Sequence, residues 1–444
     1  MTLAIETSCD DTSVAIIEKE TQNGRPVARL HFHEKVTSDN AEFRGVHPLV
    51  SLQSHQRNLA NLVSRAIQSL PSKRLPHFVS VTRGPGMRSN LFTGLDTAKG
   101  LAVAWQIPLV GVHHMQAHAL TPRMVSALHS QYSLHDSDHL APSFPFLSLL
   151  ASGGHTLLIH SASLTQHRIL GATTDIAIGE CLDKIARVIL PVEVLKTMKS
   201  TMYGALLEDF AFPPTLSQSE VSRHEESILE ATAHSAKEYI EQYGHRYDWY
   251  RVPANHELAK RRNMTKWGWS IDPPLTKAGG GTKISSFEMS FSGLTTRVER
   301  IMRCGMDPVT RKLNKAERAN ADITNEERQD LAKHTMRACF EHITSRLILG
   351  LQSLSRPDAG PAVVMAGGVA ANSFLRHILA STLVANGFPG VQLHFPPPRF
   401  CTDNAAMIGW AGIEMYENGH TDPLTIRAQR RWPLDRLEIS EEDG

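Results

Sequence analysis

Cysteine is scarce in this chain. The 444 residues hold five cysteines, an odd number, and no Cys-x-x-Cys spacing occurs. A disulfide scaffold is therefore not indicated, and the cysteine usage suits a reducing compartment better than an oxidising one. The five are Cys9, Cys181, Cys304, Cys339 and Cys401.

Long apolar runs and an excess of charge are also missing. Because no run of about 18 apolar residues occurs, we expect no membrane span. The net charge is +1 and the pI is about 7.8, so a nucleic-acid partner would have to be met by a local basic patch. A strand-like run already begins at Leu3, so we expect that a targeting peptide is absent or was removed before this numbering begins.

The composition is that of a globular protein, and the sequence contains a repeated plan. Hydrophobic residues make up 41% of the chain, and its length suits two or three domains. Residues 3–17 predict a strand, a polar turn and a strand, and residues 146–160 repeat this plan 143 positions later. The repeat predicts a duplicated α/β fold whose halves each open on a hairpin. Two unrelated hairpins are the alternative.

Other elements follow from hydrophobic periodicity and from glycine turns. We expect one polar linker between the halves, at 129–142, and a short strand at 107–112. The expected helices and strand–turn–helix units cover 48–69, 78–105, 175–190, 325–354 and 362–379.

Residues 214–288 differ from the rest in composition. They hold four of the seven tyrosines, three of the six tryptophans and the basic run KRRNMTKW at 260–267. We interpret them as an insertion, bounded at about 214–286, with its own helix over 220–243. The aromatic and basic residues either bind RNA by stacking and phosphate contacts or form a flap that packs on its own domain. The packed flap is favoured, because clustered aromatics are usually buried.

The sequence HHMQAH at 113–118 contains a candidate metal-binding pair. His114 and His118 stand four positions apart, so on a helix both rings project from one face and can close on one ion. Such pairs also occur on solvated helix faces. The zincin pattern HExxH requires a glutamate where Met115 stands, which argues against a peptidase of that type.

The sequence contains three glycine turns, and two of them are candidates for ligand contact. Gly367 and Gly368 follow an apolar strand and precede a helix, so their backbone N–H groups suit a phosphate or an adenine edge. Tight strand–helix packing explains such glycines equally well. The turn SGGH at 152–155 has the same two interpretations, whereas GPG at 84–86 is more typical of a plain turn that leads into a helix.

Several aspartates lie at turns. Asp403 stands where we expect a strand to end and a helix to begin, which suits either an N-cap or a carboxylate ligand. Asp10 and Asp11 point to opposite faces if the segment is extended, so one can approach a ligand while the other caps the turn. Asp183 stands before Lys184 early in a helix, and the plain interpretation is a surface ion pair.

Taken together, eight motifs resemble those of a known family in the same order. The motifs are IETSCDDT, TRGPG, HHMQAH, SGGHT, GECLDKIAR, SFSGL, MAGGVAANSFLR and FCTDNAAM. They resemble those of the tRNA N6-adenosine threonylcarbamoyltransferases, formerly named O-sialoglycoprotein endopeptidases. The resemblance covers about 3–215 and 287–435.

The resemblance implies a fold and a reaction. The fold is the duplicated two-lobe fold of actin, the 70-kDa heat-shock chaperones and sugar kinases, with the site in the cleft between the lobes. We expect an N-terminal lobe at 1–142, a C-terminal lobe at 143–403 and a segment 404–444 that packs back on the first lobe. The reaction moves the threonylcarbamoyl group from threonylcarbamoyl-AMP to N6 of adenosine 37 in tRNAs that read codons beginning with A, and it releases AMP.

The resemblance also implies roles for single residues. His114, His118 and Asp403 would bind one divalent ion per subunit, iron or zinc. Asp10 and Asp11 would lie beside the reacting carbonyl, where one of them could accept the proton of the amine. The implied substrate contacts are Leu150, Ala151, Ser152, Gly153, Gly154, Asp183, Gly204, Glu208, Gly367, Gly368 and Asn372.

The chain departs from the family pattern at one point. The family's Gly-Gly-Pro after the Asp-Lys helix is missing, and MYGALLE at 202–208 is the best match. The assignment of Gly204 and Glu208 as ribose contacts therefore rests on this weaker match.

The branch of the family that the chain resembles implies a cellular compartment and an oligomeric state. The motif ETSCDDT resembles the bacterial and mitochondrial branch, and the long insertion is unlike compact bacterial members. We therefore expect a fungal-type mitochondrial protein that forms a homodimer, or a cytoplasmic one if the source is bacterial. An ATP-dependent phosphotransferase of the actin-like fold is the main alternative function, and a metallopeptidase or a non-catalytic scaffold is less favoured.

Overall fold

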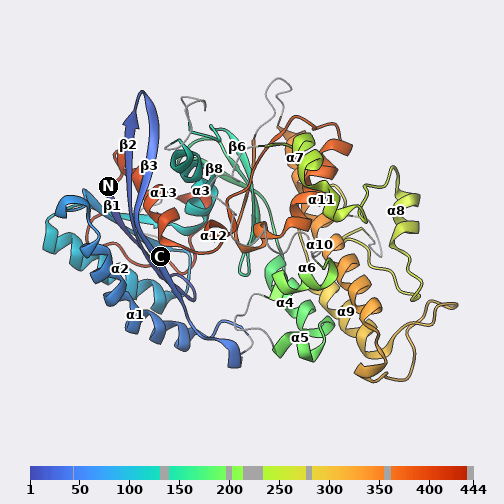
Figure 1. The fold of residues 1–444 in the computed structure, drawn as a ribbon. Helices are drawn as coiled ribbons and strands as arrows, with labels where there is room; N and C mark the ends of the chain where they lie inside the picture. The colour runs from blue at the N-terminus through green and yellow to red at the C-terminus, as the bar shows by residue number, and fades with distance from the viewer. Residues whose placement is uncertain are drawn as a thin grey trace.

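Two β-sheets with helices around and between them form the protein, described here from a computed structural model (Figure 1). The structure describes residues 1–43, 45–130, 140–196, 203–213, 234–276, 283–354 and 362–437.

The first sheet has five strands in the order β3-β2-β1-β4-β5, and β1 lies at its centre. On one side of β1 the strands form an antiparallel meander, and on the other side they run parallel to it. Side chains of β1 alternate between two cores: Leu3 and Ile5 face the helices α1 and α2, whereas Ala4 faces α13. The elements are β1 (Thr2–Glu6), β2 (Asp11–Gln22), β3 (Arg25–Thr37), α1 (Pro48–Gln68), β4 (Phe78–Gly84), α2 (Arg88–Trp105) and β5 (Leu109–His113).

The second sheet repeats this plan. Its order is β8-β7-β6-β10-β11-β9, again with an antiparallel meander on one side of the first strand and two parallel strands, β10 and β11, on the other. The short β9 is added antiparallel at the edge. The predicted duplicated two-lobe α/β fold is therefore confirmed. The strands are β6 (Phe146–Ala151), β7 (Thr156–Ser161), β8 (His167–Ala172), β9 (His234–Ser235), β10 (Ala362–Ala366) and β11 (Gln392–His394).

The helices of the second half lie around the second sheet, and most of them contribute residues to its core. They are α4 (Ile178–Ile189), α5 (Val192–Lys196), α6 (Tyr203–Ala211), α7 (Ala236–Tyr243), α8 (His256–Asn263), α9 (Ser292–Cys304), α10 (Asn325–Ser353), α11 (Ser373–Ala385) and α12 (Pro398–Cys401). Short 3-10 helices occupy Ala41–Phe43, Pro71–Lys73, Gly244–Tyr247, Asn320–Asp322, Gly368–Ala371 and Leu434–Arg436.

Two helices connect the lobes. Helix α3 (His114–His129) contributes to one core with residues of both sheets, and α13 (Ala405–Glu417) packs beside it. In Figure 1 the red α13 lies among the blue and cyan elements of the first half. A Cβ atom on Gly412 would lie 2.2 Å from Ser80 Oγ, so the helix approaches the first sheet at a distance that only glycine allows. The exact lobe boundaries stay a prediction.

The described part of the insertion is packed rather than extended. Tyr239, Tyr247, Tyr250 and Trp269 are buried in the core of the second half, where Tyr247 lies 5.2 Å from the ring of Phe374. This burial agrees with the packed flap. The helix expected over 220–243 is described only from residue 234, and α7 covers its last part.

The helices and strand–turn–helix units expected from the sequence are present, with bounds that differ by a few residues. The expected linker at 129–142 lies mostly outside the described residues, as does the insertion's glycine run. Among the helices that the structure describes, none has the length and apolar character needed to span a bilayer.

Candidate metal centre and nucleotide site

Helix α3 begins directly after β5, and a histidine caps its first turn. The ring Nδ1 of His113 accepts hydrogen bonds from the backbone N–H groups of Met115 and Gln116, at 3.1 and 3.4 Å. His114 and His118 follow on the same face of the helix, as their spacing predicts. Both side chains are almost fully buried.

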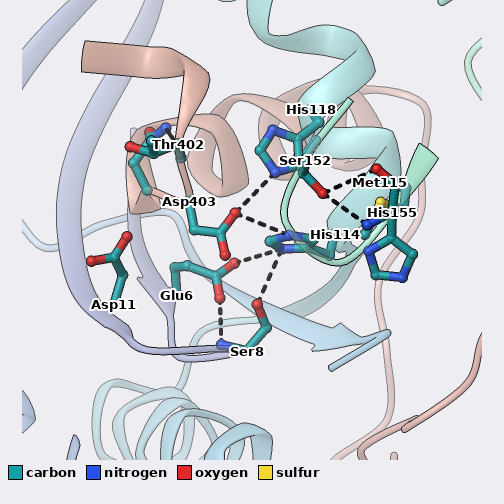
Figure 2. Close-up of polar contacts among 12 residues, drawn as sticks. Glu6, Ser8, Asp11, His114, Met115, His118, Ser152, His155, Thr402 and Asp403 are labelled. Atoms are coloured by element: carbon teal, nitrogen blue, oxygen red, sulfur yellow. Dashed lines mark hydrogen bonds and ion pairs between the residues drawn. The ribbon is translucent and has the colours of Figure 1, made fainter. Parts of the chain in front are cut away.

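The two histidines converge on one carboxylate (Figure 2). The Nε2 atoms of His114 and His118 lie 3.3 and 3.1 Å from Oδ1 of Asp403. Ligand bonds of about 2.0–2.1 Å around a tetrahedral metal place neighbouring donor atoms about 3.3 Å apart. All three donor atoms lie within 4.8 Å of one another. The donor set therefore fits a single ion, and the structure brings together three residues that the sequence could not join.

The local structure at Asp403 differs from the expectation. The helix α12, not a strand, precedes Asp403. The residue that caps α13 is Asn404, whose side chain accepts a hydrogen bond from the backbone N–H of Met407 at 3.0 Å. The N-cap interpretation of Asp403 is therefore wrong. Asn404 caps the helix, and the carboxylate of Asp403 faces the histidines instead.

Glu6 is a residue of the site that sequence reasoning missed. Its carboxylate is fully buried at the end of β1, and Oε2 lies 3.1 Å from Nδ1 of His114, opposite the nitrogen that faces Asp403. The same carboxylate accepts hydrogen bonds from the backbone N–H of Ser8 and the hydroxyl of Thr82, at 2.5 and 2.6 Å. A charged residue in the otherwise apolar strand LAIE was the available signal.

These charges shift the pKa values of the site. Burial alone would lower the pKa of His114, but the negative charges of Asp403 and Glu6 outweigh it and raise the pKa to about 10. Burial opposes ionisation of Asp403 as well, yet His114 and His118 hold its pKa well below the usual value. The pKa of His118 is lowered, because burial dominates there.

Asp10 and Asp11 have different surroundings. Both oxygens of Asp11 are engaged: Lys35 Nζ lies 3.0 Å from Oδ2, and the hydroxyl of Thr37 donates to Oδ1 at 2.5 Å. Burial raises the pKa of Asp11 to about 6 against these two partners. Asp10 is half-buried and forms no ion pair with a described residue. Burial and then the charge of Asp403 raise its pKa.

The two glycine turns of the second half lie side by side. A Cβ atom on Gly367 would lie 2.4 Å from the backbone oxygen of Ala151, and its φ of +92° is one that glycine adopts readily. A Cβ atom on Gly153 or Gly154 would meet no atom within 4 Å, so these residues leave open space. Leu150 and Ala151 are buried strand residues, so a ligand could meet only their backbone.

Asp183 and Gly204 are also brought together. The backbone N–H of Gly204 donates to Oδ1 of Asp183 at 3.0 Å, and burial raises the pKa of Asp183 to about 6. Lys184 pairs instead with Glu180, at 2.7 Å. The plain interpretation of a surface pair between Asp183 and Lys184 is therefore wrong.

Two further predicted contacts have structural partners. Glu208 is buried and its Oε1 accepts hydrogen bonds from the hydroxyl of Tyr247 and the backbone N–H of Phe374. Asn372 caps α11, because its Oδ1 accepts a hydrogen bond from the backbone N–H of Leu375 at 2.9 Å. Their contacts with a nucleotide stay predictions.

Comparison with known proteins agrees with the motif order. The family model described as tRNA N6-adenosine threonylcarbamoyltransferase matches residues 31–247 and 226–410. A Schizosaccharomyces pombe protein named tRNA N6-adenosine threonylcarbamoyltransferase, mitochondrial, is 32% identical over 445 residues, which is 98% of this chain and 87% of that protein. Proteins of the same enzyme name from Rhodopseudomonas palustris and Methylocapsa acidiphila are 30% and 31% identical over 98% of this chain and 94% and 96% of their own lengths.

The contact between Glu6 and His114 generates a prediction about metal affinity. A carboxylate on the non-ligating nitrogen orients a histidine and makes it a better ligand, and its loss typically costs 10- to 100-fold in affinity. We expect Glu6→Gln, which keeps the side-chain volume and removes the charge, to weaken zinc binding by about this factor. Competition with a zinc-binding dye measures the effect.

The exposed Glu42 supplies the control, because Glu42→Gln removes the same charge at the surface. A thermal melt of each variant checks that the protein is folded. A folded Glu6→Gln protein with the zinc affinity of the wild type would remove Glu6 from the site.

Proposed function

The chain belongs to the tRNA N6-adenosine threonylcarbamoyltransferase family, and we propose that its reaction takes place between the His114–His118–Asp403 centre and the two glycine turns. It is an acyltransferase that modifies tRNA at N6 of adenosine. The observation that carries the proposed site is the convergence of three potential ligands from the two ends of the chain.

The donor substrate is threonylcarbamoyl-AMP, and the acceptor is the adenosine on the 3′ side of the anticodon. Gly153, Gly154 and Gly368 leave room for the phosphate end of the donor beside exposed backbone N–H groups. The Asp183 carboxylate, held by the N–H of Gly204, suits the ribose hydroxyls. Positioning counts for much here, because the mixed anhydride is already activated.

The transfer step forms one bond and breaks another. The N6 amine attacks the carbonyl carbon of the threonylcarbamoyl group, the bond from that carbon to the phosphate oxygen breaks, and its electron pair leaves with AMP. The nitrogen then loses a proton to a carboxylate of the site. Backbone N–H groups of the SGGH turn stabilise the negative charge that develops on the carbonyl oxygen.

His114, His118 and Asp403 hold one divalent ion, and the mixed nitrogen and oxygen donor set suits iron or zinc. A bound ion supplies Lewis acidity towards an oxygen of the substrate. Glu6 orients His114 from the other side of the ring. With three protein ligands, a position is left open for substrate, as in catalytic rather than structural sites.

Asp10 is the better candidate for the proton acceptor. Lys35 and Thr37 occupy both oxygens of Asp11, which therefore serves to hold β2 and β3 together at the site. Asp10 has no hydrogen bond or ion pair with Lys35 or Thr37, and its pKa, like that of Asp11, is raised towards the working range of a general base.

The two alternative functions receive no support. The curated relatives named above all carry the transferase name, and the two histidines distinguish the centre from the carboxylate-bound magnesium of actin-like kinases.

We also propose that the protein works as a homodimer in mitochondria. Helices α1 and α2 carry exposed apolar side chains, among them Leu49, Phe92 and Val103, and enclose a groove of about 470 Å³ lined partly by Ile67. An apolar groove of this kind offers a surface that a second copy of the chain can cover. The name of the S. pombe relative supports the compartment. A tagged full-length protein found only in the cytosol would contradict that location.

The transfer activity is tested by reconstitution. Incubation with threonine, bicarbonate, ATP, the adenylate synthase and unmodified tRNA should yield N6-threonylcarbamoyladenosine, measured by nucleoside analysis. We expect His114→Ala to reduce the rate at least 100-fold, because the metal loses a ligand. Val309→Ala, at a side chain that is 88% exposed, is the control. Full activity of metal-stripped wild-type protein would contradict the proposed centre.

The choice between the two aspartates is tested in single-turnover assays. With both substrates saturating, we expect Asp10→Asn to slow transfer by about 10²- to 10⁴-fold, the range for loss of a general base. Asp11→Asn should mainly change stability, because it breaks the contact with Lys35. The reverse order of the two rates in folded proteins would assign the base to Asp11.

The dimer is tested by light scattering. The wild type should have about twice the 49.1 kDa mass of the chain. Ile67→Glu places a charge in the groove of α1 and α2 and should yield monomers, whereas Val309→Glu should leave the mass unchanged. A monomeric wild type at micromolar concentration would rule out the proposed assembly.

A further inference from the structure

The segment 426–432 has no regular secondary structure and lies on the first half of the protein. Ile426 and Ala428 are buried in the core beneath α1 and α2, whereas the side chains of Arg427, Arg430 and Arg431 are exposed. The apolar residues of this tail segment therefore anchor it, while Arg427 between them and Arg430 and Arg431 at the following bend are exposed.

The segment is fixed to the end of β4 and to α2. The backbone N–H of Gln429 donates to the carbonyl of Arg83 at 2.8 Å, and Lys99 Nζ donates to the carbonyl of Ile426 at 2.6 Å. A Cβ atom on Gly84 would lie 2.1 Å from the backbone oxygen of Gln429, so this close approach requires glycine. The arginines are thus held on an ordered backbone, which lowers the entropy lost on binding a partner.

Short paths connect this segment to the metal centre. The backbone N–H of Gly86 donates to the carbonyl of Arg430, and the next N–H, that of Met87, donates to the carbonyl of Ser8 at 2.9 Å. The hydroxyl of Ser8 lies 3.3 Å from Nδ1 of His114.

A second path runs through the residue that caps α3. The ring Nε2 of His113 lies 2.8 Å from the carbonyl oxygen of Trp432, so the end of the segment contacts the residue next to a predicted metal ligand. The backbone of the segment is therefore connected to the metal centre through two short chains of hydrogen bonds.

The exposed arginines form what we call the arginine surface: Arg88, at the start of α2, together with Arg427, Arg430 and Arg431. None of these four guanidinium groups pairs with an acidic side chain among the described residues. Of the nearby acids, Asp422 pairs with Arg83, and Asp435 lies on the short helix beyond the segment.

We propose that the arginine surface binds phosphates of the tRNA substrate and so orients the acceptor adenosine towards the metal centre. The inference rests on the proposed function for the identity of the RNA. Arginine presents a rigid fork of donors that matches a phosphate, and phosphate contacts set the register of a nucleic acid on its protein. Since the net charge is only +1, attraction of a polyanion needs such a local patch.

The basic residues of the insertion are a weaker candidate. Arg261 pairs with Glu257 at 2.6 Å, and Lys266 pairs with Glu326, so acidic partners offset these charges. The arginines of the tail segment have no such partners and lie next to the site.

The test compares tRNA binding and turnover in three variants. The first, Arg427→Gln with Arg430→Gln and Arg431→Gln, removes three charges from the arginine surface. We expect its affinity for unmodified tRNA to fall at least tenfold at 50 mM salt, and the slope of log K against log salt to lessen by about 2 to 3. The KM for tRNA should rise by a similar factor, with kcat and zinc content within twofold of the wild type.

Two controls make the result specific. The lysine variant of the same three positions keeps the charge and should keep the salt slope. The variant Lys260→Gln with Arg261→Gln and Lys266→Gln removes three charges from the insertion and should bind tRNA like the wild type. If the insertion variant weakens binding and the tail variant does not, the arginine surface is not the tRNA site.

Binding without the donor substrate separates this inference from the proposed function. A wild type that binds tRNA through the arginines but transfers nothing would overturn the function and leave the surface in place. A wild type that transfers normally, together with a tail variant of unchanged KM for tRNA, would overturn the surface and leave the function in place.

Discussion

Helix α3 is buried along most of its length, and the geometry of the candidate site depends on that burial. Its residues Met115 and Leu120 share one core with Phe146 and Val364 of the second sheet and with Trp410 of α13. A close-packed core holds side chains in fixed rotamers. The two histidines on the same helix are therefore held where the two halves of the chain meet, although both come from the first half.

Burial also makes the charges of the site depend on one another. His114 has a carboxylate on either side, Glu6 at Nδ1 and Asp403 at Nε2. A buried charge is costly unless a partner offsets it, and removal of one partner from a buried pair typically costs about 3–5 kcal/mol. Substitutions here consequently alter both stability and metal affinity, which is why each variant needs a measurement of folding beside the measurement of function.

The sequence was informative where a feature is local. The repeated strand–turn–strand plan at 3–17 and 146–160 predicted the duplicated sheets, and the spacing of His114 and His118 predicted a shared face. The sequence could not predict features that depend on tertiary contacts. Asp403 is 285 positions from His118, and the role of Glu6 depends on its contact with the ring of His114. Whether Asp403 or Asn404 caps α13 also depends on the backbone conformation of the turn before the helix, which the sequence does not give.

One continuous segment, residues 403–432, links the chemistry to the proposed recognition of RNA. It begins with the carboxylate that faces both histidines and continues as α13, whose Gly412 brings it against the first sheet. It ends as the segment 426–432, which carries three of the four residues of the arginine surface. Because the same sheet supports both ends, the distance between the metal centre and the bound phosphates is fixed by the fold. An enzyme that modifies one adenosine of a large RNA needs that fixed distance, since phosphate contacts position the substrate without reading its sequence.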